Sequence, residues 1–340
     1  MNNNSYDSFG LMKAWRLAAR SSMFNAVIIV MVLLTTMVVL KPNYLSSENV
    51  YQLTKVLTVT ALIGFSQMIC IASGGLNVSV GATGALCAIL AGGAMEVYDI
   101  SAGWAFLIGI SGGVACGLFN GLLIYRAGGV GVAFFLTTLA TMSVFQGLNY
   151  TITSGRPFYG IKPEFLAIGD TAIMGLPSSF FIMLFVAMIL IFMFQKMIIG
   201  RQILAFGANS KSSELYGVSK FKVVVISSVI AGVLAAIAGL MALIRIEAAQ
   251  PSMGSDWMLL SFAATLIGGT RLAGGRVNVV GVIVGGAALT IINNSLIHMQ
   301  VNVYWNALIY GLVILLASSM DRLRYINKVV RDYRGYSGKK

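Results

Sequence analysis

The sequence predicts an all-α integral membrane protein, built as a single domain of about ten transmembrane helices. Of its 340 residues, 58% are hydrophobic and only 10% are charged, whereas a soluble domain typically carries about 25% charged residues. The uncharged residues also form long unbroken stretches without the alternating pattern of a membrane β-barrel. Lipid offers the backbone no hydrogen-bond partners, so such stretches are expected to be helices.

The expected spans follow these uncharged stretches, because a helix needs about 20 apolar residues to cross a bilayer. The stretches are 21–40, 56–95, 101–125, 127–155, 171–195, 223–244, 257–270 and 277–320. The two longest, 56–95 and 277–320, each predict two spans. The 257–270 stretch is short and indicates a segment that stops within the membrane, so eight or nine spans are the alternatives to ten.

The basic residues predict the orientation, since Lys and Arg concentrate in cytoplasmic loops. With ten spans, 18 of the 23 Lys and Arg residues fall on the side of both termini, and seven of the 11 acidic residues fall on the other side. We therefore expect a cytoplasmic segment 1–20, a transmembrane bundle 21–320 and a basic cytoplasmic tail 321–340. The first apolar stretch is too long for a cleaved signal peptide and no small-residue cleavage site follows it.

Several function classes are not expected. The net charge of +12 reflects topology rather than nucleic-acid binding, because the basic residues flank the spans. The single histidine, His298, lies near the end of a span and joins no metal-ligand cluster. The cysteines are typical of buried packing positions, and the chain lacks the Gly-Lys-Ser/Thr ending of an ATP-binding loop. We expect no catalytic residue, metal or cofactor on this chain.

Glycine spacing predicts close helix packing. Gly109, Gly113, Gly117 and Gly121 recur at every fourth position and so line one helix face. A second pair with the same spacing, Gly281 and Gly285, predicts another close contact.

Two polar segments are candidates for function. Residues 73–81, Ser-Gly-Gly-Leu-Asn-Val-Ser-Val-Gly, interrupt the 56–95 stretch with paired glycines. Interrupted helices at membrane depth are tolerated where they line a cavity or lie within protein, so this motif predicts a transport pathway; a turn between two spans is the alternative. In the cytoplasmic segment 199–222, we expect a turn at Gly207 and Asn209, followed by a short helix over 210–216 with Ser210 as its N-cap. This segment is a docking surface or an ordinary connector.

Five blocks of sequence resemble the permease subunits of bacterial sugar ABC importers of the ribose type. Residues 74–81 resemble the family's GGIDLSVG motif, and residues 120–124 its NGLLI motif. Residues 200–218, 250–276 and 304–317 resemble three further motifs, and all five keep the family's order over about 50–325.

The resemblance implies the partners of this chain. A second permease subunit would complete the pathway, cytoplasmic ATPase subunits would carry ATP and Mg²⁺, and a periplasmic or lipid-anchored sugar-binding protein would deliver the substrate. The ATPase would dock on the 199–222 segment of the inner-membrane permease. The corresponding docking residues are Gly200, Arg201, Ala205, Gly207, Asn209, Glu214 and Gly217.

The sequence departs from the family pattern at three notable places. Asn77 stands where the family usually has Asp, which removes a charge from the expected pathway. Glu214 replaces a usual Arg and Lys211 a frequent Glu, which suggests a charge exchange with a matching ATPase.

The expected function is import of a small neutral sugar such as ribose, because ions would need pairing groups in the spans. The polar pathway candidates are Asn77, Ser79, Gln67, Asn120 and Thr138; Asn120 is equally suited to joining two helices. The candidates for docking the binding protein are Arg156, Lys162 and Arg245, with solvated loop charges as the alternative. A nucleoside or branched-chain amino acid permease and a stand-alone secondary transporter or channel remain open.

Overall fold

The computed structural model describes residues 22–302, 305, 308–312 and 315. The first five helices in these residues are α2 (Ser22–Leu40), α3 (Ser47–Ala72), α4 (Val80–Tyr98), α5 (Ala102–Arg126) and α6 (Val132–Thr153). A short α7 (Pro163–Asp170) and a two-stranded hairpin, β1 (Ala172–Ile173) and β2 (Leu176–Pro177), follow. The remaining helices are α8 (Ser178–Lys196), α9 (Ile198–Ala208), α10 (Ser210–Leu215), α11 (Lys220–Ile246), α12 (Trp257–Ile267) and α13 (Val279–His298).

Seven helices of the described part are long and apolar enough to cross a membrane, namely α3, α4, α5, α6, α8, α11 and α13. The prediction of an all-α, multiply spanning membrane protein is therefore confirmed. The second span expected within 277–320, the 1–20 segment and the 321–340 tail fall largely or wholly outside the described residues, and the total of about ten spans stays a prediction.

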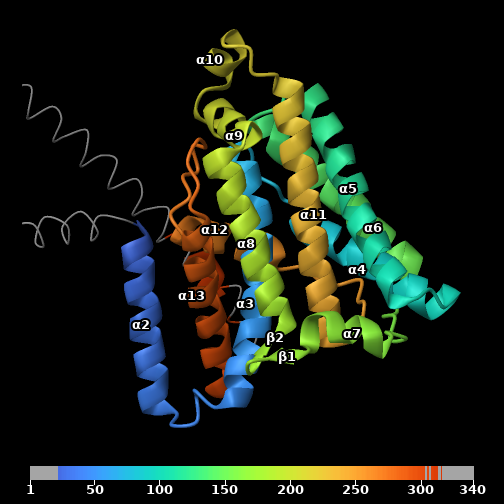
Figure 1. Ribbon diagram of the computed structural model, residues 1–340, viewed down its shortest axis with the longest axis vertical. Helices are drawn as coiled ribbons and strands as arrows, with labels where there is room; N and C mark the ends of the chain where they lie inside the picture. Colours follow the sequence, from blue (N-terminus) through green and yellow to red (C-terminus); the bar gives the residue numbers. More distant parts are fainter. Residues whose placement is uncertain (1–21, 303–304, 306–307, 313–314, 316–340) are drawn as a thin grey trace, which may run out of the picture.

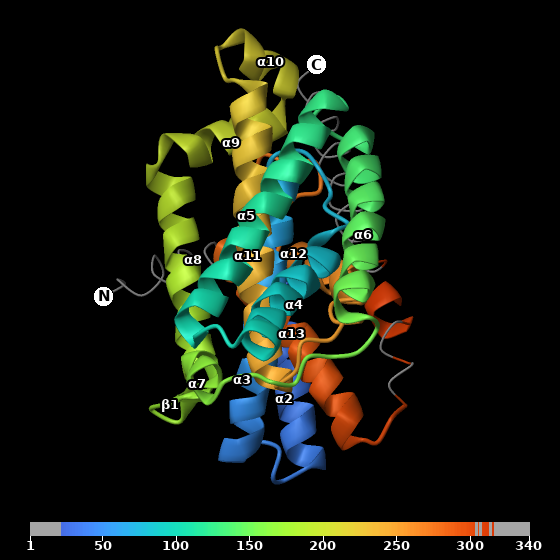
Figure 2. The ribbon, with the colours of Figure 1, turned by 90° about the vertical axis from the view of Figure 1, so that its right-hand side faces the viewer.

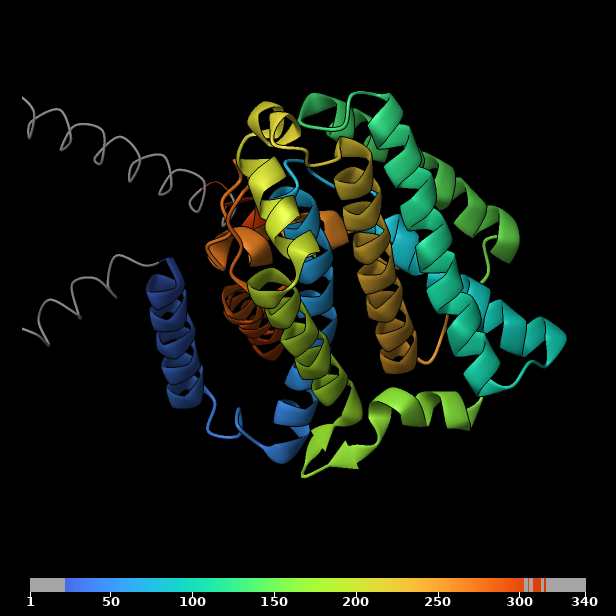
Figure 3. The same ribbon diagram turned by 45° about the horizontal axis from the view of Figure 1, so that its top comes forward.

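The centre of the bundle is formed by α3 and α11. Helix α11 packs against α5, α3 and α4, and α3 also contacts α12 and α13 (Figures 1 and 2). Helix α2 stands at the edge, where it packs on α13 (Figure 3). Helices α9 and α10 lie at one end of the bundle, called here the α10 end, while α7 and the hairpin lie at the opposite, α7 end (Figure 1).

The predicted glycine contacts are confirmed. A Cβ atom added to Gly117 of α5 would lie 2.6 Å from the Ser228 carbonyl oxygen and 2.7 Å from Val229 Cα of α11. Gly113 faces the Gly232 carbonyl in the same way, at 2.6 Å. Along α12 and α13, Gly281 and Gly285 face backbone carbonyls of α12 and its C-terminal end, as their spacing indicated.

The paired glycines end α3. Gly74 has a φ of +88°, which favours glycine, and its N–H donates to the Ile71 carbonyl at 3.0 Å. The Gly75 N–H donates to the Cys70 carbonyl at 2.9 Å, so the two bonds form a Schellman cap. Residues 73–79 are non-helical and α4 begins at Val80. The 257–270 stretch also forms a short helix, α12, about 16 Å long at 1.5 Å per residue.

The expectation for the 199–222 segment is wrong in two details. Gly207 lies inside α9 rather than in a turn, because the helix continues to Ala208. The N-cap of α10 is Asn209 rather than Ser210, since the extended Asn209 backbone lets its Oδ1 accept from the Ser212 N–H at 3.0 Å.

Candidate functional site

The five polar residues predicted for the pathway come together around the non-helical 73–79 segment. Gln67 is contributed by α3, Asn120 by α5 and Thr138 by α6, while Asn77 and Ser79 belong to the segment itself. Three helices therefore converge on one interruption of the chain, which is a grouping that their separation in the sequence does not reveal.

Asn77 is bound through both its main chain and its side chain. In the orientation that satisfies both groups, the Gln67 amide donates to the Asn77 carbonyl at 2.8 Å and accepts from the Asn77 N–H at 3.2 Å. The Asn77 Oδ1 accepts from the Ser79 N–H and from the Ser79 hydroxyl, each at 2.9 Å. Because a non-helical backbone leaves N–H and C=O groups without ladder partners, these side chains replace the missing bonds.

Asn120 and Thr138 complete the network. The Asn120 Nδ2 donates to the Ser79 Oγ at 2.9 Å, and the Thr138 Oγ1 accepts from the Val78 N–H at 3.1 Å. The Thr138 hydroxyl also lies 3.1 Å from the Leu76 carbonyl, on the other side of Asn77. One threonine thus contacts the segment at two backbone positions.

The network is buried within this chain. None of its five side chains belongs to a residue more than 6% exposed. The adjoining hollow measures about 10 Å³, far below the roughly 300–1,000 Å³ of sites that hold small-molecule ligands. In this conformation the five residues position the 73–79 segment, and direct contact with substrate stays a prediction for them.

The 73–79 segment is in contact with the predicted docking segment at the α10 end. A Cβ atom added to Gly207 of α9 would overlap the Ala72 carbonyl at the end of α3 and would lie 3.1 Å from the Gly275 nitrogen. The Gly275 N–H donates to the same Ala72 carbonyl at 3.4 Å, and the Gly74 carbonyl accepts from the Gly131 N–H at 3.0 Å. The backbones of α9, α3 and the 268–278 loop therefore meet without intervening side chains.

The other predicted docking residues lie along α9 and α10. Gly200 is buried against the Met193 backbone, Gly207 is half-buried, and the rest are exposed, namely Arg201, Ala205, Asn209, Glu214 and Gly217. Sequence reasoning missed Leu215 and Tyr216, which are 88% and 89% exposed at the tip of the segment. The sequence did contain a signal for them, because these two large side chains directly follow the polar run 210–214. Because they adjoin each other at the tip of the segment, these two side chains are candidates for a protein contact.

The three residues predicted to contact the binding protein lie at the α7 end, but they differ in whether they form an ion pair within the chain. Arg156 and Arg245 are exposed. Lys162 pairs with the Asp99 carboxylate at 2.6 Å and donates to the Asp99 carbonyl at 2.9 Å. This hydrogen bond, together with the ammonium charge, lowers the pKa of the Asp99 carboxyl. Lys162 is thus engaged within the chain, whereas no ion pair of Arg156 occurs among the described residues.

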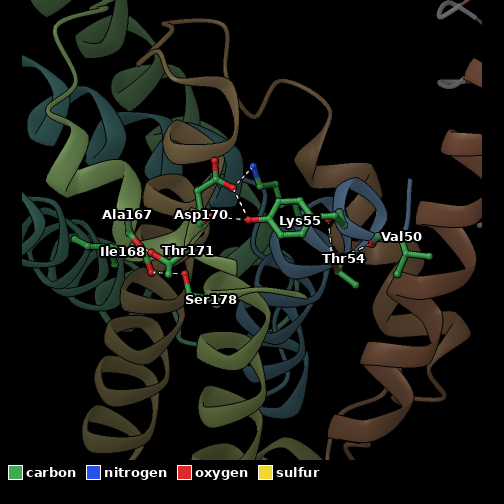
Figure 4. A network of polar contacts seen from close by, with 9 residues as sticks. Val50, Thr54, Lys55, Ala167, Ile168, Asp170, Thr171 and Ser178 are labelled. Carbon is green, nitrogen blue, oxygen red and sulfur yellow. Dashed lines mark hydrogen bonds and ion pairs between the residues drawn. The ribbon is translucent and has the colours of Figure 1, made fainter. Parts of the chain in front are cut away.

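A second polar network fastens α7 to α3 (Figure 4). Lys55, buried in the first half of α3, forms an ion pair with Asp170 at the end of α7. The Tyr51 hydroxyl donates to the same residue, 2.5 Å from its carbonyl and 2.9 Å from its carboxylate. A buried charge is costly unless it is paired. This network therefore holds helix α7 against α3.

Comparison with known proteins identifies the family of this chain. Residues 49–318 match the family model described as "Branched-chain amino acid transport system / permease component". The chain belongs to this family. Its relatives include the ribose import permease of Bacillus subtilis, which is 33% identical over 84% of this chain and 88% of the relative. The D-allose transport system permease of Escherichia coli is 32% identical over 84% and 86%.

The ribose import permease of Escherichia coli is 29% identical, over 91% of this chain and 95% of its own length. The resemblance to sugar ABC-importer permeases drawn from the five sequence motifs is therefore confirmed. The matched region contains the 73–79 segment, both polar networks and the α9–α10 segment.

The Thr138 hydroxyl is predicted to stabilise the fold. Thr138→Val keeps the side-chain shape but leaves the buried Val78 N–H without its acceptor, which should cost about 1–3 kcal/mol. Thr137→Val is the matched control, because the Thr137 hydroxyl donates to the Ala133 carbonyl of its own helix at 2.7 Å. The melting temperature in detergent is expected to fall by several degrees for Thr138→Val and to stay unchanged for Thr137→Val. Equal melting temperatures for the two variants would contradict the assigned role.

Proposed function

We propose that this chain is the membrane permease subunit of an ABC importer for a small neutral sugar such as ribose or a related monosaccharide. The observation that carries the proposal is the similarity, over most of both chains, to permeases named for ribose and allose import. ATP and Mg²⁺ bind to separate ATPase subunits, a second permease subunit completes the pathway, and an extracytoplasmic binding protein delivers the sugar.

The topology that fits this function has ten spans with both termini in the cytoplasm of a bacterial cell and the α10 end facing the ATPase. Support comes from the excess of basic residues on that side in the sequence. In this topology the 257–270 stretch, which contains α12, is one of the ten crossings, and the 73–79 segment interrupts the helices at membrane depth. The buried side-chain network supports this depth, because backbone groups in lipid must be satisfied within the protein.

The docking segment couples ATP hydrolysis to the bundle in this proposal. Leu215 and Tyr216 anchor the ATPase, and Glu214 beside them provides the charge that a matching ATPase pairs with. Displacement of α9 is passed through the Gly207 backbone contact to the end of α3 and the 73–79 segment. No flexible side chain lies between these backbones to absorb the motion.

A branched-chain amino acid is the second candidate substrate, because the description of the matching family model names that class. The relatives named for sugars favour the first candidate.

The function is tested by reconstituting the chain with its ATPase and binding protein in liposomes and measuring accumulation of radiolabelled ribose, allose and leucine. ATP-dependent accumulation of a sugar is expected. Tyr216→Ala should reduce copurification of the ATPase and sugar uptake at least severalfold, because it removes an exposed anchor. Tyr159→Ala, an exposed tyrosine near the α7 end, is the control for copurification of the ATPase. Uptake of leucine alone, or full uptake by Tyr216→Ala, would count against the proposal.

Arg156 is proposed to contact an acidic residue of the binding protein. Arg156→Glu should weaken stimulation of ATP hydrolysis by the loaded binding protein and leave the basal hydrolysis rate intact, because the site lies at the end opposite the ATPase. The stimulation curve is measured as a function of binding-protein concentration. An unchanged half-maximal concentration would assign Arg156 to the solvated loop charges.

A further inference from the structure

A groove of about 500 Å³ lies beside the 73–79 segment, and none of the five network residues lines it. One wall is a face of α6, from Met142 to Tyr150, and the other is the 252–255 loop with the start of α12. Val78, Gly81 and Ala82 form the floor. The groove is therefore built on the same interruption of the chain that the buried network holds in place.

Glycines bring the walls and floor of the groove together. A Cβ atom added to Gly81 would overlap the Gly254 carbonyl, so the loop rests directly on the start of α4. On the opposite wall, nothing lies within 4 Å of the position that a Cβ atom of Gly147 would occupy, which leaves that face of α6 open.

The lining of the groove is polar but uncharged. Hydroxyl groups come from Ser143, Tyr150, Ser252 and Ser255, an amide comes from Gln146, and no lining residue is Asp, Glu, Lys, Arg or His. The Gln146 Nε2 donates to the Pro251 carbonyl at 2.8 Å, which ties α6 to the loop. Among the described residues, no donor is paired with the Gln146 amide oxygen, so it is available as an acceptor.

We propose that this groove is the sugar-contacting surface of the permease, with Ser143, Gln146 and Ser255 supplying its hydrogen bonds. The inference rests on the proposed function and deepens it by assigning the ligand class to particular residues. A neutral polyhydroxylated ligand matches hydroxyl and amide groups that both donate and accept. The zwitterion of an amino acid would leave its ammonium and carboxylate unpaired here, which is costly away from bulk water.

The volume agrees with this ligand class. Small-molecule sites commonly measure roughly 300–1,000 Å³, and the groove falls within this range, unlike the hollow beside Asn77. Tyr150, 47% exposed, adds an aromatic face against which the apolar face of a sugar ring packs. The groove thus offers both kinds of contact that a monosaccharide makes.

Cysteine labelling tests the groove directly, because the three native cysteines, Cys70, Cys87 and Cys116, are all buried. Ser143→Cys places a thiol in the groove, and Val144→Cys places one at the same depth on a face of α6 that does not line it. The complete complex with ATPase and binding protein is held in lipid nanodiscs and treated with a charged methanethiosulfonate reagent. Labelling rates are measured by mass spectrometry with ribose, with leucine and with neither.

We expect Ser143→Cys to be labelled at least tenfold faster than Val144→Cys, and ribose but not leucine to slow it severalfold. Equal labelling rates for the two variants would overturn the proposal. They would mean that lipid or a second copy of the chain fills the groove and keeps the reagent out. Protection by leucine alone would overturn the ligand class. If the unsubstituted complex imports ribose while labelling is unprotected, only the groove fails; if it imports no sugar, the proposed function fails and the groove with it.

Discussion

Direct contact between backbones at glycine positions is the constraint on which the rest of this structure depends. Lipid provides little hydrophobic drive for helices to associate, so their packing relies on close approach. Gly117 lets α5 lie against α11, Gly81 lets the 252–255 loop lie on α4, and Gly207 lets α9 lie on the end of α3. The first contact forms the core, the second shapes the groove, and the third joins the docking segment to both.

The interruption at 73–79 is compatible with membrane depth because its backbone groups find partners inside the protein. The neutral Asn77 suits this position, since its side-chain oxygen accepts from both the N–H and the hydroxyl of Ser79. A carboxylate would accept the same bonds but would add a buried charge. The exchange of the family's usual Asp for Asn therefore preserves the local structure while lowering the electrostatic cost of burial.

Much of this architecture was predictable from the sequence, and the remainder depended on tertiary packing. Uncharged stretches located the helices because length and apolarity alone decide whether a segment spans lipid. Glycine spacing identified the face of α5 that packs closely, but not α11 as its partner. The polar residues predicted for the pathway lie together in one network, but the sequence did not show that this network is buried within the chain. Ser143 and Gln146 were missed because the face of α6 that becomes a groove is set by α4 and the 252–255 loop. Gly207 was expected in a turn because glycine preferences describe the isolated chain.

The central claim is that the Gly207 contact transmits motion from the ATPase to the 73–79 segment. Its most direct test is the amount of sugar accumulated per ATP hydrolysed by the reconstituted complex carrying Gly207→Ala. The control is Gly103→Ala in α5, because a Cβ atom there would meet nothing within 4 Å. The account predicts that Gly207→Ala still binds the ATPase and hydrolyses ATP but accumulates several times less sugar per ATP, while Gly103→Ala behaves as the unsubstituted chain. An unchanged ratio for Gly207→Ala would contradict it.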